Sequence, residues 1–229
     1  MRSPSVVARL FFIAVLSGVA GCFSLSRDTP SLEQYVLRGA STAAAAATQV
    51  PSGITLGVRR LDLAAYLATP SIVVRRGEHQ IGTSDFHRWG EDPVQGISRA
   101  VASHMAASAA IRAVSVAPWP VRTDHDYLVQ FHVSRFEGIT DSDLPTTTGS
   151  AQVAATWEIL RPADGTVLAR GGADYRQQGW RVGDYAALVT MLEEGLTGVA
   201  RDVVSCVQRL AAAAQPAADA MIETALACP

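Results

Sequence analysis

Hydrophobic and polar residues alternate in several stretches of the chain and predict β-strands, because neighbouring side chains of a strand point to opposite faces. In the clearest stretch, residues 126–137, Tyr127, Val129, Phe131 and Val133 share one face. Similar patterns predict strands at residues 54–58, 72–76, 79–83, 151–160 and 167–176. Turn residues at Arg76-Gly77-Glu78 and at Pro162-Ala163-Asp164-Gly165 should fold neighbouring strands into hairpins.

Two other segments carry hydrophobic residues at helical spacing. The first begins at Asp92-Pro93, with Asp92 as N-cap and proline at the first helical position, and runs to about Ala110. The second begins with Asp184 as N-cap and continues to Leu210. Two amphipathic helices can cover one face of a single sheet. We therefore predict an α+β fold, a two-layer sandwich in which two helices cover one mostly antiparallel sheet of about five strands.

The first 21 residues have the pattern of a bacterial secretion leader. After a basic start, the apolar run Leu10–Leu16 is too short to span a bilayer, which needs about 20 residues. Val19-Ala20-Gly21-Cys22 has the pattern of a lipobox, since the processing peptidase needs small residues beside the cut and a thiol directly after it to carry diacylglycerol. We expect residues 1–21 to be a lipoprotein signal peptide and Cys22 to be lipidated. An ordinary secretory leader cut after Ala20 is the alternative.

Lipidation at Cys22 would also set the location of the protein. Two or more lipid signals suffice for stable anchoring. Phe23 stands where an inner-membrane retention signal of the enterobacterial kind has Asp, so the periplasmic face of the outer membrane is the expected site. The formal net charge of −2 and the lack of a basic block argue against nucleic acid or an anionic membrane surface as an electrostatic partner.

The organisation of the chain suggests one domain with flanking segments. Residues 22–53 are expected to be the lipidated N-terminus and a linker, within which residues 32–37 form a short strand that docks on the domain. The domain itself is predicted at residues 54–210, and residues 211–229 are expected to be an Ala-rich C-terminal tail. Cys206 and Cys228 form an even pair in an oxidising compartment, which predicts a disulfide. The alternative is a buried apolar Cys206 and a separate tail thiol at Cys228.

No catalytic site, metal site or cofactor is predicted from the sequence. The chain contains no GxxxxGK[ST] loop, GxSxG elbow, HExxH or CxxC, and its five histidines do not recur at metal-ligand spacing. Asp124-His125-Asp126 has residue types suited to acid–base chemistry. Adjacent residues of an extended chain point to opposite faces, so we interpret this segment as a polar lead-in to a strand. Asp141 and Asp143 have the composition of an ordinary exposed loop, which is favoured over a cation site or a partner-binding tip.

Arg88 and Trp89, just before the first helix, are the candidate partner-contact residues. A flat ring buries a large area and a guanidinium forks onto carboxylates, so these residue types often anchor interfaces. In the alternative, Trp89 caps the core while Arg88 pairs with a neighbouring acid. Both interpretations can hold for the same tryptophan.

The sequence resembles the ABC-type transport auxiliary lipoproteins, a family that includes PqiC-like proteins. The resemblance is carried, in chain order, by the lipobox Cys22, Tyr35-Val36-Leu37, Leu61-Asp62-Leu63-Ala64-Ala65-Tyr66-Leu67, Pro70-Ser71-Ile72-Val73-Val74-Arg75, Arg88-Trp89-Gly90-Glu91 and Arg135-Phe136-Glu137-Gly138. It implies a non-enzymatic subunit of an MCE-type system that moves lipids between two membranes. The implied partner is the MCE-domain protein, held at the outer membrane by this chain, and assembly of several copies into a homo-oligomer stays open.

Other functions stay open beside this one. A small lipid-tethered α+β domain also suits a regulator or activator of a periplasmic cell-envelope enzyme. An enzyme is disfavoured by the lack of clustered nucleophile, base or metal ligands. Lipid carried inside the domain is disfavoured because a sheet covered by Ala-rich helix faces leaves no evident room for an acyl chain.

Overall fold

The computed structural model describes residues 31–40, 53–120, 123–140, 147–214 and 226–228. Cys22, the leader and most of the linker lie outside these residues, as do Asp141 and Asp143. The described residues belong to one compact unit that begins at Leu32, apart from Ser31. No described helix is long and apolar enough to cross a membrane.

Ten strands and two α-helices form the described part of the chain, which confirms the predicted α+β class. The strands are β1 (Glu33–Tyr35), β2 (Ile54–Val58), β3 (Asp62–Leu63), β4 (Ser71–Arg76), β5 (Gln80–Trp89), β6 (Ile111–Val116), β7 (Tyr127–Thr140), β8 (Thr148–Leu160), β9 (Val167–Arg181) and β10 (Leu226–Ala227). The helices are α3 (Pro93–Ala106), α4 (Tyr185–Ala214) and the short 3₁₀ helix η1 (Ala65–Leu67).

The sheet is larger than the predicted five strands, and its strands run in both senses. Its main order is β1-β5-β4-β7-β8-β9-β10, with β2 and β3 paired to β7, and β6 to β2. The long pairings β4–β5, β7–β8 and β8–β9 are antiparallel, as predicted. The shorter pairings are parallel, including β1 with β5 and β4 with β7. The strands that the sequence did not predict, β3, β6 and β10, have two to six residues, which is too short for a clear alternating pattern.

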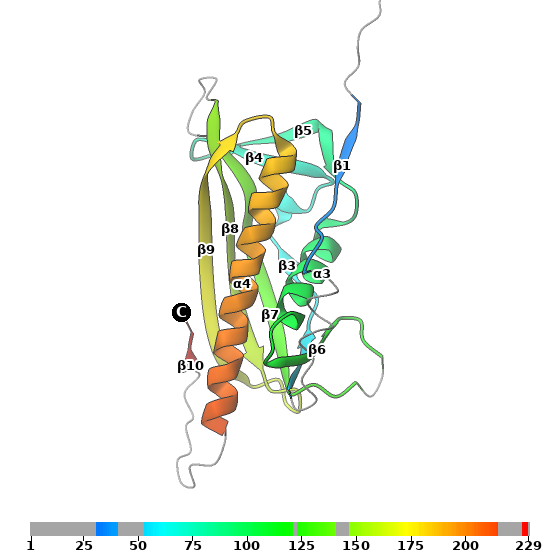
Figure 1. The fold of residues 1–229 in the computed structure, drawn as a ribbon, viewed down its shortest axis with the longest axis vertical. Coiled ribbons are helices and arrows are strands. Elements are labelled where there is room, and N and C mark those ends of the chain that lie inside the picture. The colour runs from blue at the N-terminus through cyan, green and yellow to red at the C-terminus, as the bar shows by residue number, and fades with distance from the viewer. Residues whose placement is uncertain (1–30, 41–52, 121–122, 141–146, 215–225, 229) are drawn as a thin grey trace, which may run out of the picture. The chain divides into compact units, whose positions relative to one another are not determined.

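Both helices lie on one face of the sheet, as Figure 1 shows. The predicted caps are present, since Asp92 accepts a hydrogen bond from the Gln95 N–H (3.1 Å) and Asp184 from the Ala187 N–H (3.0 Å). Helix α3 ends at Ala106, earlier than predicted, because the next residues turn into strand β6. Helix α4 continues past Leu210 to Ala214.

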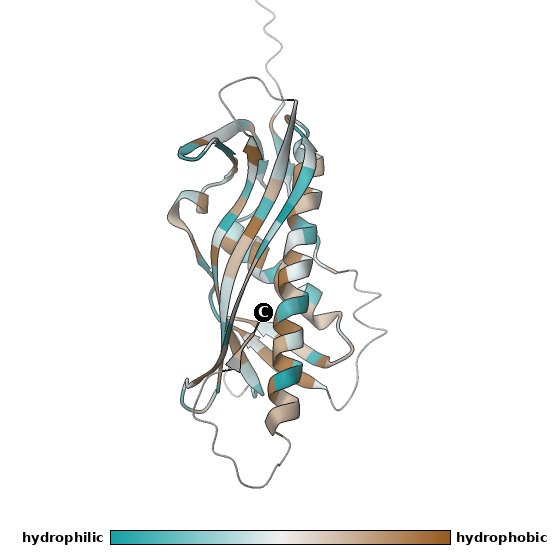
Figure 2. Cartoon of the chain, turned by 90° about the vertical axis from the view of Figure 1, so that its left-hand side faces the viewer, coloured by the Kyte–Doolittle hydropathy of each residue, from teal (hydrophilic) through white to brown (hydrophobic). Residues whose placement is uncertain are grey.

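The core fills the space between α4 and the long strands. Teal and brown positions alternate along these strands in Figure 2, as expected for a sheet with one face turned to the helices. The largest fully buried side chains include Phe131, Trp157, Trp180, Leu188, Leu192 and Leu196. Two glycines let α4 approach closely: a Cβ on Gly195 would lie 2.6 Å from Val153 Cγ2, and one on Gly198 would lie 2.5 Å from Tyr175 Cζ. The predicted stripe of α4 is therefore a packing surface.

Candidate functional site

The structure separates the two predicted contact residues, Arg88 and Trp89. The side chain of Trp89 is 9% exposed and its ring lies 5.6 Å from that of Phe136, centroid to centroid. Its backbone N–H donates to the Pro70 carbonyl (2.7 Å). Arg88 is exposed, and the structure shows no ion pair for it among the described residues. Trp89 therefore supports the core, as in the alternative interpretation, while Arg88 is the member of the pair that another molecule can reach.

A small hollow of about 210 Å³ lies where β5 meets helix α3. It is lined by Pro70 before β4 and by Trp89, Gly90 and Glu91 at the end of β5. Two segments of the family resemblance, one at Pro70 and the other at Trp89 to Glu91, thus converge at the start of α3. Glu91 pairs with Arg99 of α3, so the wall of the hollow is fixed to the helix.

The segment after β1 is fastened across both helices. Arg99 of α3 donates to the Leu37 carbonyl (3.0 Å), and the Gly39 N–H donates to Glu193 Oε1 of α4 (2.6 Å). Gly39 has φ +71°, and a Cβ there would lie 2.7 Å from Ser103 Cβ. Position 39 therefore needs glycine both for its left-handed backbone and for its close approach to α3. The predicted docking of residues 32–37 on the domain is confirmed by this segment and by β1.

Four side chains clasp β1 to β5 and to the start of α4. The Tyr35 hydroxyl donates to Glu33 Oε2 (2.5 Å) and lies 3.2 Å from His87 Nδ1. The His87 ring stacks on Tyr185, the first residue of α4, with centroids 4.0 Å apart. Burial, followed by the hydrogen bond to Glu33, raises the pKa of Tyr35 to about 12. Strand β1 is thus held to the domain by these side-chain contacts.

The family-like segment Arg135-Phe136-Glu137-Gly138 serves the interior of the fold. Phe136 contacts Trp89, as described above. Gly138 leaves room for two core side chains, because a Cβ there would lie 2.9 Å from Trp180 Cζ3 and 3.0 Å from Leu188 Cδ2. Arg135 and Glu137 point to the opposite face of the sheet, where they enter a polar cluster.

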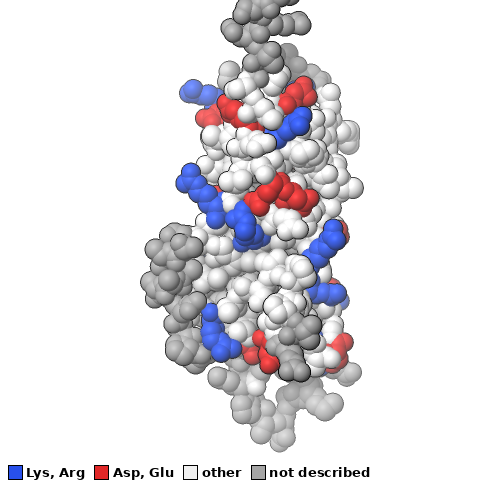
Figure 3. Space-filling view, turned by 90° about the vertical axis from the view of Figure 1, so that its right-hand side faces the viewer, with Lys and Arg blue, Asp and Glu red and all other residues white. Residues whose placement is uncertain are grey.

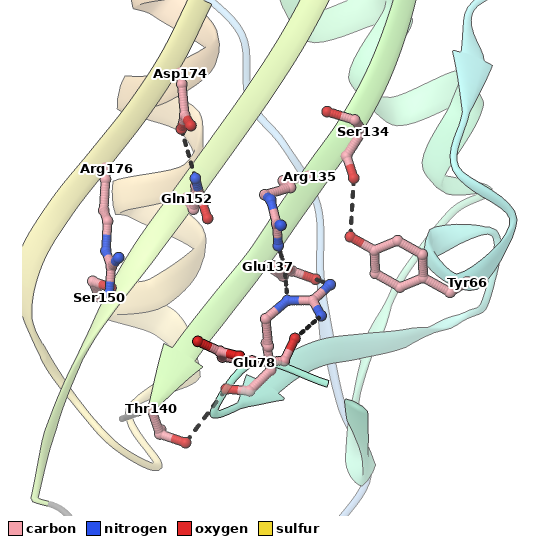
Figure 4. Close-up of polar contacts among 11 residues, drawn as sticks. Tyr66, Glu78, Ser134, Arg135, Glu137, Thr140, Ser150, Gln152, Asp174 and Arg176 are labelled. Carbon is pink, nitrogen blue, oxygen red and sulfur yellow. Dashed lines mark hydrogen bonds and ion pairs between the residues drawn. The ribbon is translucent and has the colours of Figure 1, made fainter. Parts of the chain in front are cut away.

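This polar cluster, shown in Figure 4, is centred on Glu137, whose side chain is fully buried. Arg75 of β4 donates to it through Nε (2.6 Å to Oε1) and Nη2 (3.3 Å to Oε2). Arg135 donates to the same Oε1 (3.0 Å). The Arg75 guanidinium lies 5.5 Å from the centre of the Tyr66 ring, and the Tyr66 hydroxyl donates to the Ser134 carbonyl.

The charges of the cluster compensate one another. The hydrogen bond from Arg75 to Glu137 raises the pKa of the guanidinium above its usual value, so Arg75 stays charged. Burial and the neighbouring Glu137 carboxylate raise the pKa of Tyr66, which keeps its proton. Tyr66, Arg75, Arg135 and Glu137 all belong to the segments that carry the family resemblance. These four side chains join β4, β7 and η1. Their arrangement places no nucleophile beside a base.

The remaining candidate for chemistry, Asp124-His125-Asp126, does not converge on one point. Asp126 accepts hydrogen bonds from the Thr55 N–H and hydroxyl, both at 2.7 Å, while Asp124 is exposed. Burial would raise the Asp126 pKa, but these hydrogen bonds outweigh it and the pKa is lowered. His125 packs edge-on against Trp119. The predicted polar lead-in to a strand is confirmed, and no cluster of three potential metal ligands occurs in the described ranges.

The C-terminus returns to the domain at the far edge of the sheet. Cys228 follows β10, which pairs with β9, and its sulfur is bonded to that of Cys206 on α4. The two Cα atoms are 5.7 Å apart, within the usual range for a disulfide. On the side of the domain drawn in Figure 3, basic and acidic side chains are interspersed and neither sign forms a continuous block.

Comparison with solved structures identifies the fold. The crystal structure of a DUF330 protein from Xanthomonas campestris is similar, with a TM-score of 0.61 and 19% sequence identity, over 80% of this chain and 97% of that one. The crystal structure of an uncharacterized protein is similar over 77% of this chain and 99% of that one, with a TM-score of 0.60 and 15% identity. No curated protein sequence matches significantly.

Comparison with family models identifies the class of protein. Residues 35–204 match the model of the ABC-type transport auxiliary lipoprotein component. The chain therefore belongs to this family of auxiliary lipoproteins of ABC-type transport. The match begins at Tyr35 in β1 and ends within α4, so it includes the docked segment from Leu37 to Ala40, the polar cluster and Trp89.

Proposed function

We propose that this chain is an outer-membrane lipoprotein that serves an MCE-type lipid transport system as a non-catalytic subunit. The observation that carries the proposal is the family match over residues 35–204, together with the lipobox that ends at Cys22. In this role the acyl chains hold the domain at the periplasmic face of the outer membrane. The domain holds the far end of an MCE-domain protein, whose inner-membrane complex supplies the energy.

Several features of the domain support a holding role rather than a catalytic one. The segments of the family resemblance fix the ends of strands and helices to each other, through the Glu137 cluster and the contact of Trp89 with Phe136. The docked segment from Leu37 to Ala40 adds hydrogen bonds to α3 and α4, including one from the Ser103 hydroxyl to the Ala40 carbonyl. A load applied between the lipid and a bound partner would pass through this segment.

The anchor is tested first, by intact mass and membrane fractionation. We expect the protein extracted from native membranes to begin at Cys22 and to carry acyl mass. A Cys22→Ala variant should leave the outer-membrane fraction while keeping the unfolding midpoint of the wild type. A mature chain that starts at Gly21 without lipid would overturn the lipoprotein assignment.

The partner is tested by co-purification from membranes solubilised in mild detergent. We expect MCE subunits to co-purify with the wild type, and an Arg88→Glu variant to capture less of them, because Arg88 is exposed at the end of β5. Arg161→Glu, in the β8–β9 turn, is the matched control. Recovery of peptidoglycan synthases in place of MCE subunits would favour the envelope-enzyme regulator instead.

A further inference from the structure

The exposed hydrophobic side chains of the domain gather at one end. In the described part of the chain, the large hydrophobic residues with more than a third of their surface exposed are Leu32 (52%), Val36 (55%), Ile81 (36%), Phe86 (38%) and Val182 (38%). They come from the residues on either side of β1, from β5 and from the turn between β9 and α4, and these elements meet at the top of Figure 1. We call this group of five residues the apolar end.

Backbone pairing and ring stacking hold these elements together. Strand β1 pairs with β5 in the register Glu33 to His87, and His87 stacks on Tyr185 at the start of α4. A Cβ on Gly90 would lie 3.0 Å from Val36 Cγ1, so Val36 covers the end of β5. The elements that carry the apolar end are therefore held in fixed positions relative to one another. A concentration of this kind on a secreted domain usually marks a contact with a membrane or a protein.

The length of the chain before β1 indicates which contact this is. Ten residue steps separate Cys22 from Leu32, so a fully extended chain places Leu32 at most about 36 Å from the lipidated residue. Helix α4 starts at the apolar end and has 30 residues, which corresponds to about 45 Å along the domain. If the domain stood on its other end, Leu32 would be farther from the bilayer than this tether can reach.

We propose that the apolar end rests on the lipid bilayer and inserts Leu32, Val36 and Phe86 into the headgroup layer. This inference rests on the lipidation of Cys22 in the proposed function. Aliphatic and aromatic side chains that enter the interface add to the hold of an acyl anchor and fix the orientation of the domain. Arg88, which pairs with Gln34 in the β1–β5 register, borders the apolar end. A partner bound through Arg88 is then held beside the bilayer.

The chain itself offers a way to place one probe at each end of the domain. Cys22 is acylated in the mature protein and Cys206 is bonded to Cys228, so a single introduced cysteine is the reactive thiol. Phe86→Cys places it at the apolar end. Ala163→Cys is the matched control, since Ala163 is exposed in the β8–β9 turn, at the other end of the long strand β9. Both full-length lipidated variants are labelled with a polarity-sensitive fluorophore.

The labelled proteins are reconstituted in vesicles of phosphatidylethanolamine and phosphatidylglycerol, with and without a headgroup nitroxide lipid. We expect nitroxide to quench the probe at position 86 several-fold more than the probe at 163, with a blue-shifted emission at 86. A second probe from Val182→Cys should behave like position 86. Equal quenching at 86 and 163 overturns the inference. A blue shift at 86 without nitroxide quenching also overturns it, because the apolar end is then covered by protein.

Intact mass of the same samples separates this inference from the proposed function. Acyl mass on Cys22 with equal quenching at both ends refutes the bilayer contact alone. Absence of acyl mass refutes the anchor, and with it the proposed location.

Discussion

The buried carboxylate of Glu137 should be the most sensitive polar group of the domain, and Glu137→Gln tests this without changing the shape of the side chain. The substitution removes the charge that two guanidinium groups share and turns an amide donor toward the Arg75 donors. Arg75 is 14% exposed and Glu137 fully buried, so water cannot replace the lost interaction. Breaking a buried ion pair by removing one partner costs about 3–5 kcal/mol.

The Arg135 contact adds little to this figure. Its side chain is 40% exposed, and ion pairs with that much solvent contribute at most about 1 kcal/mol. We therefore expect the free energy of unfolding of Glu137→Gln to be lower by about 3 kcal/mol. With a urea m-value of about 2 kcal/mol/M, the unfolding midpoint should fall by about 1.5 M.

Urea unfolding followed by circular dichroism measures this midpoint, and a neighbouring ion pair supplies the control. Glu158 pairs with Arg170 at 2.8 Å across β8 and β9, but both side chains are at least 40% exposed. Glu158→Gln should therefore change the free energy of unfolding by less than about 1 kcal/mol. If Glu137→Gln shifts the midpoint no more than Glu158→Gln does, the cluster does not hold β4 to β7 and the reasoning is wrong.

Three further predictions concern the core, the C-terminus and the clasp on β1. Trp89→Ala should lower the free energy of unfolding by about 3–5 kcal/mol, and Trp89→Phe should lower it by clearly less. Urea unfolding measures both values, and equal costs would contradict a packing role for Trp89. Thiol counting on the unreduced, unfolded mature protein should find neither Cys206 nor Cys228 reactive, and Cys228→Ser should free one thiol and cost about 3 kcal/mol. In the folded protein the pKa of Tyr35 is about 12, whereas in the unfolded chain this tyrosine ionises near its ordinary pKa of 10.0. The free energy of unfolding should therefore fall as the pH rises from about 10 to 12. Urea unfolding midpoints measured across this pH range should fall less steeply for Tyr35→Phe than for the wild type.

The parts of the fold that the sequence predicts are those whose signals are local. Strand β7 shows strict alternation, and the caps at Asp92 and Asp184 each need one side chain and one nearby N–H. The hairpin between β8 and β9 has its turn residues in sequence. These elements can be predicted because the interactions that define them lie within a few residues of one another.

The parts that were missed depend on distant partners. Strand β6 becomes a strand because it pairs in parallel with β2, some 55 residues earlier in the chain, and residues 111–116 alone show only a short apolar run. Strand β10 is two residues long and exists through its pairing with β9. Such non-local pairing leaves no periodic signal in the sequence.

The candidate site shows the same division. Arg88 and Trp89 are neighbours of the types that anchor interfaces, and the sequence could not say which of the two is exposed. The placement of β5 in the sheet decides it, because successive residues of a strand face opposite sides and the side of Trp89 is the one turned to the core. No sequence signal marked Leu32 as a surface residue, since a hydrophobic residue beside a strand is normally buried. Its exposure became visible only when β1 was placed at the edge of the sheet.

The edge position of β1 would link the proposed lipid anchor to the rest of the domain. A strand that follows a lipid tether transmits whatever pulls on the lipid, and here it is clasped by Tyr35 and His87 and fastened to α3 and α4 through Gly39. The residues on either side of this strand, Leu32 and Val36, are two of the five residues of the apolar end. In the proposed arrangement, one short segment would set both the distance and the orientation of the domain at the membrane. A holding subunit needs both to be fixed, because a partner aligned with the bilayer must not rotate about a flexible tether.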